Sequence, residues 1–336
     1  MNDRPARRFV VVGGGTAGWL AAFMLQDALK RQNINARVTV VESSKIPTVG
    51  VGEATTAVFR QMLQHFGIDE FEFLRETEAT FKLGIKHHEW RRKGYSYFGP
   101  IDDPHLVVAP SFERPESFID IFSVAAGRPV VQTHLYEYLL EQKKSPFARK
   151  ADGSFIPLGP YHHAYHFDQA LVGKYFSRKS KGVEILDAQI TSALKNSETG
   201  NIEALVADDG QLIKGDFFID CTGFRRSLIA KEMGAKWVSY GHNWPINRAL
   251  PFWVDFKEGE EINPYTLAWA RNAGWMWAIP TQKRLGCGYV YSDQFLTPEA
   301  AQAEIETALG HKIEPRGDIK LDVGRLDRAW VGNCLA

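Results

Sequence analysis

One short segment holds the residues best suited to chemistry, the stretch EATFKLGIKHHEW from Glu78 to Trp90. Phe81, Leu83 and Ile85 alternate with polar residues or glycine, and this period of two predicts a half-buried strand. Lys82 lies inside that pattern. It is either a solvated surface charge or an ammonium group held in a cleft.

A second group of candidate residues is the cluster His162, His163 and His166, which Asp168 follows. The spacing of His162 and His166 would align them on a helix, but residues 161–167 read as extended, and Asp168 reads as the N-cap of a helix over 168–181. There is no HExxH motif and no second cluster. We therefore expect no metal site here.

The elements that would position a cofactor begin near the N-terminus. A β-branched run over 9–12 leads into Gly13-x-Gly15-x-x-Gly18, and a helix over 19–30 follows. A second strand over 37–42 then ends in an acidic residue, Glu42. This order of strand, glycine turn, helix, strand and acid is the context of the dinucleotide-binding fingerprint.

Each residue of this fingerprint has a separate physical role. Gly13 allows the tight turn, Gly15 lets the backbone approach a pyrophosphate, and Gly18 lets the helix pack against the strand. The helix N-terminus attracts phosphate, and Glu42 can accept a hydrogen bond from a ribose hydroxyl. The alternative is a glycine-rich turn that binds nothing.

The rest of the chain predicts a mixture of helices and strands. Residues 56–76 read as a helix with an apolar core face, and 95–130 read as an irregular segment rich in aromatic residues. A hairpin turning at Gly210 is followed by a strand over 217–220, which runs into Cys221-Thr222-Gly223. This ending resembles FAD-binding proteins of the two-dinucleotide-fold kind, and the resemblance implies that the strand returns to the first sheet. Strand-like runs over 250–256 and 286–291 predict a second, antiparallel sheet.

Composition excludes several classes of partner. The chain has 336 residues, and 40 Lys and Arg residues balance 40 Asp and Glu residues, so no basic excess favours nucleic acid or a membrane. The three cysteines, Cys221, Cys287 and Cys334, form no zinc spacing. Without a signal segment or an apolar run of membrane-spanning length, we expect a cytoplasmic protein.

Several motifs together resemble the flavin-dependent halogenases of the tryptophan halogenase family. The resemblance runs from about residue 9 to the end of the chain. It rests on GGGTAGW at 13–19, IPTVGVGEAT at 46–55, ATFKLGIKHHEW at 79–90, YHFD at 165–168, FIDCTGFR at 218–225 and WMWAIP at 275–280. The lysine strand and the WxWxIP element are specific to that family, whereas the glycine motif is not.

The resemblance implies a fold and a chemistry. The fold would be α/β, an FAD-binding two-dinucleotide fold of the glutathione-reductase type, with a Rossmann-type parallel sheet and an antiparallel sheet layer. A separate flavin reductase would supply FAD as FADH2, and O2 would give a flavin C4a-hydroperoxide. Chloride or bromide would then give hypohalous acid, which a lysine would hydrogen-bond or carry as a haloamine toward an electron-rich arene such as an indole.

The resemblance also implies roles for individual residues. Lys82 would be catalytic, and Trp275, Trp277, Ile279 and Pro280 would form the wall between the substrate and the flavin. The residues that would bind the cofactor are Gly13, Gly15, Thr16, Ala17, Gly18, Glu42, Val51, Gly52, Glu53, Ala54 and Ile190.

The resemblance implies one halogenase-type domain over residues 1–336. Its FAD-binding parts would lie at about 8–56 and 182–230, and its substrate-side parts at about 57–181 and 231–320. The family's C-terminal helical region does not follow Ala336, so we expect an incomplete chain. The alternatives are an aromatic monooxygenase using FAD or an inactive FAD-binding fragment, and the arene, the halide preference and a homodimer stay open.

Overall fold

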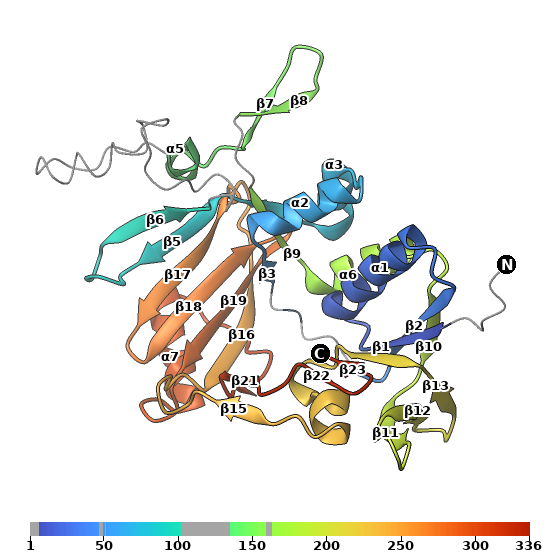
Figure 1. Cartoon of the computed structure of the whole chain (residues 1–336). Coiled ribbons are helices and arrows are strands. Elements are labelled where there is room, and N and C mark those ends of the chain that lie inside the picture. The colour runs from blue at the N-terminus through green and yellow to red at the C-terminus, as the bar shows by residue number, and fades with distance from the viewer. Residues whose placement is uncertain (1–6, 47–49, 51, 102–134, 159–162) are drawn as a thin grey trace, which may run out of the picture. The chain divides into compact units, whose positions relative to one another are not determined.

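A computed structural model describes residues 7–46, 50, 52–101, 135–158 and 163–336, which form two compact units (Figure 1). Unit 1 comprises Met1–Gly50, Gln169–Trp244 and Asp322–Ala336. Unit 2 comprises Val51–Asp168 and Pro245–Leu321. No helix among the described residues is both long enough and apolar enough to cross a membrane.

The centre of unit 1 is a six-stranded sheet. Its strand order is β10 (Glu184–Asp187), β2 (Ala36–Glu42), β1 (Arg7–Val12), β14 (Phe217–Asp220), β23 (Cys334–Leu335) and β22 (Trp330–Val331). All neighbours are parallel except β22 and β23. Phe9 pairs with Phe217, so the strand predicted over 217–220 does return to the first sheet.

Two helices lie side by side on one face of this sheet, α1 (Thr16–Arg31) and α6 (Gln169–Lys179) (Figure 1). The centre of β1 is buried because parallel strands are covered on both faces, which explains its uninterrupted β-branched run. The predicted helices over 19–30 and 168–181 are confirmed within a few residues.

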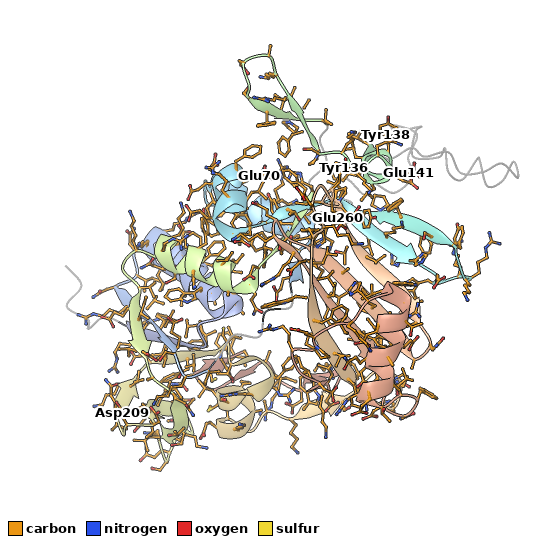
Figure 2. All side chains as sticks on the ribbon, turned by 180° about the vertical axis from the view of Figure 1, so that it is seen from behind. Glu70, Tyr136, Tyr138, Glu141, Asp209 and Glu260 are labelled. Atoms are coloured by element: carbon orange, nitrogen blue, oxygen red, sulfur yellow. The ribbon has the colours of Figure 1, made fainter. Side chains whose placement is uncertain are left out.

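Smaller elements complete unit 1. The predicted hairpin is confirmed as β12 and β13, with Asp209 in its turn (Figure 2). The bounds are β11 Ile190–Lys195, β12 Ile202–Ala207, β13 Leu212–Lys214, a 3-10 turn Gly223–Arg225, a π-helical turn Ser227–Glu232, β15 Trp237–Ser239 and β21 Gly324–Leu326.

Unit 2 is built on a seven-stranded sheet. Its order is β20 (Ile319–Lys320), β16 (Arg248–Asp255), β19 (Arg284–Tyr291), β18 (Gly274–Pro280), β17 (Tyr265–Arg271), β5 (Gly84–His88) and β6 (Ser96–Pro100). All neighbours are antiparallel except β17 and β5, which confirms the predicted antiparallel sheet. Helix α7 (Pro298–Leu309) packs on one face over a core that includes Phe252 and Tyr289.

A three-stranded sheet in the same unit carries the candidate lysine. Its order is β3 (Glu53–Ala54), β9 (Ala164–Phe167) and β4 (Thr80–Lys82). The remaining elements of unit 2 are α2 Ala57–His65, α3 Glu70–Thr77, α5 Leu135–Glu141, β7 Phe147–Arg149 and β8 Phe155–Pro157.

Three predictions about local structure are wrong in detail. The helix predicted over 56–76 is two helices, because the chain turns at Gly67, where φ is +63°. The strand predicted over 78–90 is two strands, β4 and β5, in different sheets. The described start of the segment predicted to be irregular contains β6.

The division of the lysine strand has a visible cause. The N–H of Leu83 donates to the carbonyl of Pro264 at 2.8 Å, so the chain leaves one sheet and enters the next at this residue. Lys82 and Leu83 are consequently both buried, at 7% and 0% exposure, whereas Phe81 is half-buried. The predicted alternation of polar and apolar faces is therefore wrong here, although Lys82 does point inward.

The fold class predicted from the sequence is confirmed, with a parallel dinucleotide-type sheet and a separate antiparallel sheet. Unit 1 also contains α6 and residues 322–336, which the predicted FAD-binding parts omitted. The single domain stays a prediction. Val51, His162 and most of the segment 95–130 lie outside the described residues.

Candidate active site

The glycine turn of unit 1 depends on two glycines for its packing. Gly13 has φ of +119°, and a Cβ there would lie 2.2 Å from the carbonyl oxygen of Cys221 at the end of β14. A Cβ on Gly18 would lie 1.7 Å from the carbonyl oxygen of Gly13. Both positions therefore require glycine, and the roles predicted for them, a tight turn and helix packing, agree with this geometry.

Gly15 differs because it faces open space. A Cβ on Gly15 would meet only Nε2 of Gln169, at 3.8 Å. Gly15 is also the N-cap of α1, with no side-chain hydrogen bond to the cap and no acidic residue in the first turn, where Thr16 and Ala17 lie. The backbone N–H groups there keep the positive end of the helix dipole available for an anion.

A cavity of about 380 Å³ opens beside this turn, entirely within unit 1. Its walls come from the glycine turn, the end of β2 and helix α6: Gly14, Gly15, Trp19, Glu42, Gln169, Ala170, Gly173, Lys174, Ser177 and Arg178. Space, free N–H donors, a carboxylate acceptor and two cationic side chains fit the diphosphate and ribose of a dinucleotide. The residues present therefore fit a dinucleotide, the kind of cofactor that the family resemblance implies.

Glu42 lies where the fingerprint places it, but it has a partner that the sequence did not predict. The indole Nε1 of Trp19 donates to Oε2 of Glu42 at 3.1 Å. Helix α6 is a second missed contributor to this cavity, and Thr16 Oγ1 donates to the carbonyl of Gln169 at 3.0 Å. Ile190, by contrast, begins β11 and packs against a hydrophobic cluster, and it does not line this cavity.

Lys82 is a buried charged residue of unit 2. Its side chain is buried, and its Nζ donates to the carbonyl of Thr55 at 2.8 Å. No carboxylate forms an ion pair with Lys82 among the residues that the structure describes. Burial therefore lowers the pKa of Lys82 from 10.5 to about 8.

Unit 2 brings three of the sequence motifs together around this lysine. Gly52 has φ of +82°, and a Cβ there would lie 3.4 Å from the side chain of Ile279 in the WMWAIP strand. Glu53 and Ala54 follow Gly52 and form β3. The next residue is Thr55, whose carbonyl accepts the hydrogen bond from Lys82. Thr80, two residues before Lys82, donates from Oγ1 to the carbonyl of Pro280 at 2.6 Å.

The two tryptophans of the WMWAIP strand, Trp275 and Trp277, lie close together. The rings of Trp275 and Trp277 lie 6.3 Å apart between centroids. A Cβ on Gly288 would lie 2.1 Å from the ring of Trp277, so this indole lies over Gly288 on the neighbouring strand. Its Nε1 is buried and has no hydrogen-bond partner among the described residues. An unpartnered donor of this kind suits a surface that meets a bound molecule.

The described histidines of the predicted cluster make other contacts. Glu70 lies on α3 (Figure 2). His163 Nε2 contacts its carboxylate, and the hydroxyl of Tyr165 donates to the same carboxylate at 2.7 Å. Burial alone would raise the pKa of Glu70, but these hydrogen bonds lower it to about 2. Among the described residues, no group of three or more His, Cys, Asp or Glu side chains could hold a metal.

The parallel sheet with its glycine turn and the separate antiparallel sheet define an α/β protein of the dinucleotide-binding type. Within that class, the chain belongs to the tryptophan halogenase family, whose model matches residues 8–336. The family resemblance inferred from the sequence motifs is thereby confirmed.

Individual relatives agree with this assignment. The chain is 33% identical to the tryptophan 6-halogenase SttH of Streptomyces toxytricini over 358 residues, covering 100% of this chain and 67% of that protein. A flavin-dependent halogenase from Xanthomonas campestris has a TM-score of 0.84 at 32% identity, covering 99% of this chain and 65% of the other.

A third similar structure is the flavin-dependent halogenase BrvH from a Brevundimonas species, with a TM-score of 0.84 at 31% identity. It is matched over 98% of this chain and 65% of its own. The chain therefore spans about two thirds of the length of the relatives it matches.

Proposed function

We propose that the protein is a flavin-dependent halogenase that chlorinates or brominates an electron-rich aromatic compound, of which an indole is the model. FAD would arrive reduced from a separate flavin reductase, with O2 and chloride or bromide as co-substrates. The proposal is supported by family membership and by relatives named as tryptophan or flavin-dependent halogenases.

One observation in the structure carries the proposal. The amine of Lys82 is buried without a carboxylate partner among the described residues, and burial alone lowers its pKa. A lysine with a structural role normally lies at the surface or pairs with an acid, because burying an uncompensated ammonium is costly. A pKa near 8 leaves both protonation states accessible near neutral pH.

Reduced FAD, when bound, would supply the two-electron chemistry that turns halide and O2 into hypohalous acid. In one route, the neutral amine of Lys82 attacks the halogen: an N–halogen bond forms, the O–halogen bond breaks, and the hydroxyl leaves as water with a proton from the amine. The arene then takes the halogen, and loss of the ring proton restores both the aromatic ring and the amine.

In the other route, the charged ammonium of Lys82 donates a hydrogen bond to the oxygen of hypohalous acid. This bond polarises the O–halogen bond and fixes the direction from which the arene meets the halogen. Both routes need the Lys82 amine in a fixed position. The hydrogen bond from Lys82 to the carbonyl of Thr55 would fix the amine in either route.

The remaining site residues receive supporting roles in this proposal. The turn at Gly13, Gly15 and Gly18, together with Glu42, would hold the adenosine diphosphate end of FAD. Thr16 and Ala17, in the first turn of α1, would make further contacts with this end of the cofactor. The contacts predicted for Val51, Gly52, Glu53, Ala54 and Ile190 stay predictions. Trp275, Trp277, Ile279 and Pro280 would form the wall that keeps the arene from the flavin, which suppresses direct oxygen transfer.

The test is turnover by the 336-residue protein with FAD, a flavin reductase, chloride or bromide, and a panel of indoles, followed by product mass spectrometry. We expect a monohalogenated product from the unaltered protein and none from Lys82→Met, with FAD binding unchanged in a spectroscopic titration. Lys86→Met is the matched control, because Lys86 lies over the rings of Phe98 and Tyr265 at 5.8 and 5.7 Å and should be dispensable.

Three outcomes would contradict the proposal. Halogenated product from Lys82→Met would remove the lysine from the chemistry. Hydroxylated product formed without halide would instead identify a monooxygenase, and FAD binding without any turnover would identify a binding protein.

A further inference from the structure

His166 is fully buried and joins strands of the three-stranded and the seven-stranded sheets of unit 2. Its Nδ1 lies 3.2 Å from Oγ1 of Thr80 on β4, and its Nε2 lies 2.9 Å from Oγ1 of Thr266 on β17. The ring itself belongs to β9, so one side chain connects three strands. Buried imidazoles bonded at both nitrogens hold their neighbours in a fixed orientation.

The hydrogen-bond chain determines which nitrogen carries the proton. The single hydroxyl proton of Thr80 is used in the 2.6 Å bond to the carbonyl of Pro280. Oγ1 of Thr80 must therefore accept from His166, so Nδ1 carries the hydrogen. Nε2 of a neutral ring then accepts from the hydroxyl of Thr266, and all the donors and acceptors of this chain are matched.

The ring stays neutral in this environment. Full burial and the nearby charge of Lys82 lower the pKa of His166 well below its ordinary value of 6.5. A protonated ring would place a second donor against Thr266 and a second positive charge close to Lys82. The tautomer with hydrogen on Nδ1 therefore persists through neutral pH.

The same strand controls both ends of the Lys82 contact. Thr80 pairs with His166 and Lys82 pairs with Ala164, so β9 sets the position of the lysine along β4. The N–H of Thr55 donates to the carbonyl of Tyr165 at 2.9 Å, so β9 also holds the residue whose carbonyl accepts from Lys82. A shift of this strand would move the donor and the acceptor together.

We propose that His166, through Thr80 and Thr266, is a positioning residue that fixes the Lys82 amine against the carbonyl of Thr55. The expected effect on turnover rests on the proposed function, whereas the hydrogen bonds that position Lys82 do not depend on it. His166 does not touch the reacting atoms in this proposal. It acts by holding β4 to the carbonyl of Pro280 and to β17.

The first test measures the ring directly. Nitrogen NMR of the protein labelled in histidine distinguishes a ring protonated on Nδ1 from one protonated on Nε2. We expect His166 to carry its hydrogen on Nδ1 and not to titrate across neutral pH. A ring protonated on Nε2, or one that titrates near its ordinary pKa, would overturn the inference.

The second test breaks the chain at Thr80 and reads the effect at Lys82. Thr80→Val keeps the shape of the side chain but removes the hydroxyl. Thr77→Val is the control, because the hydroxyl of buried Thr77 donates only to the carbonyl of Phe73 at 2.6 Å, within one helix. Carbon NMR of labelled lysine side chains gives the pKa of Lys82 without any cofactor.

We expect Thr80→Val to raise the pKa of Lys82 from about 8 toward 10.5, because a loosened strand admits water to the amine. Thr77→Val should leave it unchanged. In turnover assays, Thr80→Val should lower kcat about tenfold or more with KM for the arene almost unchanged. Equal pKa values in the two variants would refute the positioning role, whereas turnover by Lys82→Met would refute only the proposed function.

Discussion

At the scale of single residues, the most informative quantity is the free energy that burying the charged Lys82 side chain costs the folded protein. Its ammonium is desolvated and receives only a neutral carbonyl as acceptor in the described structure. Most buried charges are compensated by an opposite charge, as Glu70 is by Arg60 at 3.3 Å. A buried ammonium without an opposite charge lowers the free energy of unfolding, and a role in chemistry gives a reason for its presence.

The cost of Lys82 should be visible as pH-dependent stability. Lowering the pKa from 10.5 to about 8 costs about 3 kcal/mol below pH 8, because each pKa unit corresponds to about 1.4 kcal/mol. Between pH 8 and 10.5 the unfolded state binds more protons than the folded state, so stability rises with pH and this cost disappears.

We therefore expect Lys82→Met to be more stable than the unaltered protein at about pH 7, and this advantage to shrink toward about pH 10. Urea unfolding of both proteins at several pH values gives the difference in free energy, in which the other ionisable groups cancel. A difference that does not change with pH would mean that the amine is not desolvated in the folded protein.

At the scale of elements, two neighbouring glycines of the same turn should respond differently to alanine. A methyl group on Gly18 would press against the backbone oxygen of Gly13, so we expect Gly18→Ala to destabilise unit 1 by about 3 kcal/mol or more. A methyl group on Gly15 meets nothing closer than 3.8 Å, so the free protein should fold with a loss of about 1 kcal/mol or less.

Gly15→Ala should instead weaken FAD binding by about tenfold or more, because the methyl group enters the space in which a diphosphate approaches the helix N-terminus. Thermal unfolding without FAD and a spectroscopic FAD titration separate the two effects. If Gly15→Ala bound FAD normally, the cavity beside α1 would not be the cofactor site.

Sequence patterns predicted the elements better than their contacts. The β-branched run over 9–12, the glycine turn and the strand over 217–220 were predicted because a local pattern encodes each of them. The division of the lysine strand at Leu83 was not, because periodicity does not say which sheet a strand joins. Its inward lysine followed from the family resemblance more than from alternation.

The candidate site shows the same limit. Lys82, Gly52 and Pro280 were each found from motifs, but their convergence depends on pairing between distant strands. The role of His166 was missed because its partner Thr266 lies 100 residues further along the chain. The wall that α6 contributes to the cavity was missed for the same reason, although the helix itself was predicted.

At the scale of the whole molecule, chain order and compact units do not coincide. Unit 1 takes three separate segments of the chain and unit 2 takes two. The last segment of unit 1 adds β22 and β23 to the parallel sheet and places Cys334 in the hydrophobic core of that unit. The dinucleotide-type sheet is therefore completed only by residues more than 300 positions after its first strand.

Asn333 joins this last segment to the middle of the chain. Its Oδ1 accepts from the N–H of Ile202 at 2.9 Å, and its Nδ2 donates to the carbonyls of Ile202 and Asp216 at 2.8 and 3.2 Å. Its own carbonyl accepts from Phe218 on β14 at 2.9 Å. The side chain thus satisfies backbone groups of β12 and of the bend before β14.

We expect Asn333→Ala to lower the free energy of unfolding of unit 1 by about 2 kcal/mol, because three hydrogen bonds are lost and each contributes about 0.5–1.5 kcal/mol. Asn243→Ala is the control, because the exposed side-chain amide of Asn243 bonds no described residue other than the adjacent His242, through its ring. The stability of unit 1 is measured as the denaturant concentration at which FAD binding is lost, and the state of unit 2 is measured as the NMR signal of Lys82.

Asn333→Ala should lower the denaturant midpoint for FAD binding and leave the Lys82 signal unchanged, since every hydrogen bond that it removes lies within unit 1. Equal unfolding midpoints for the two variants would show that the last segment contributes little to the sheet that carries the glycine turn.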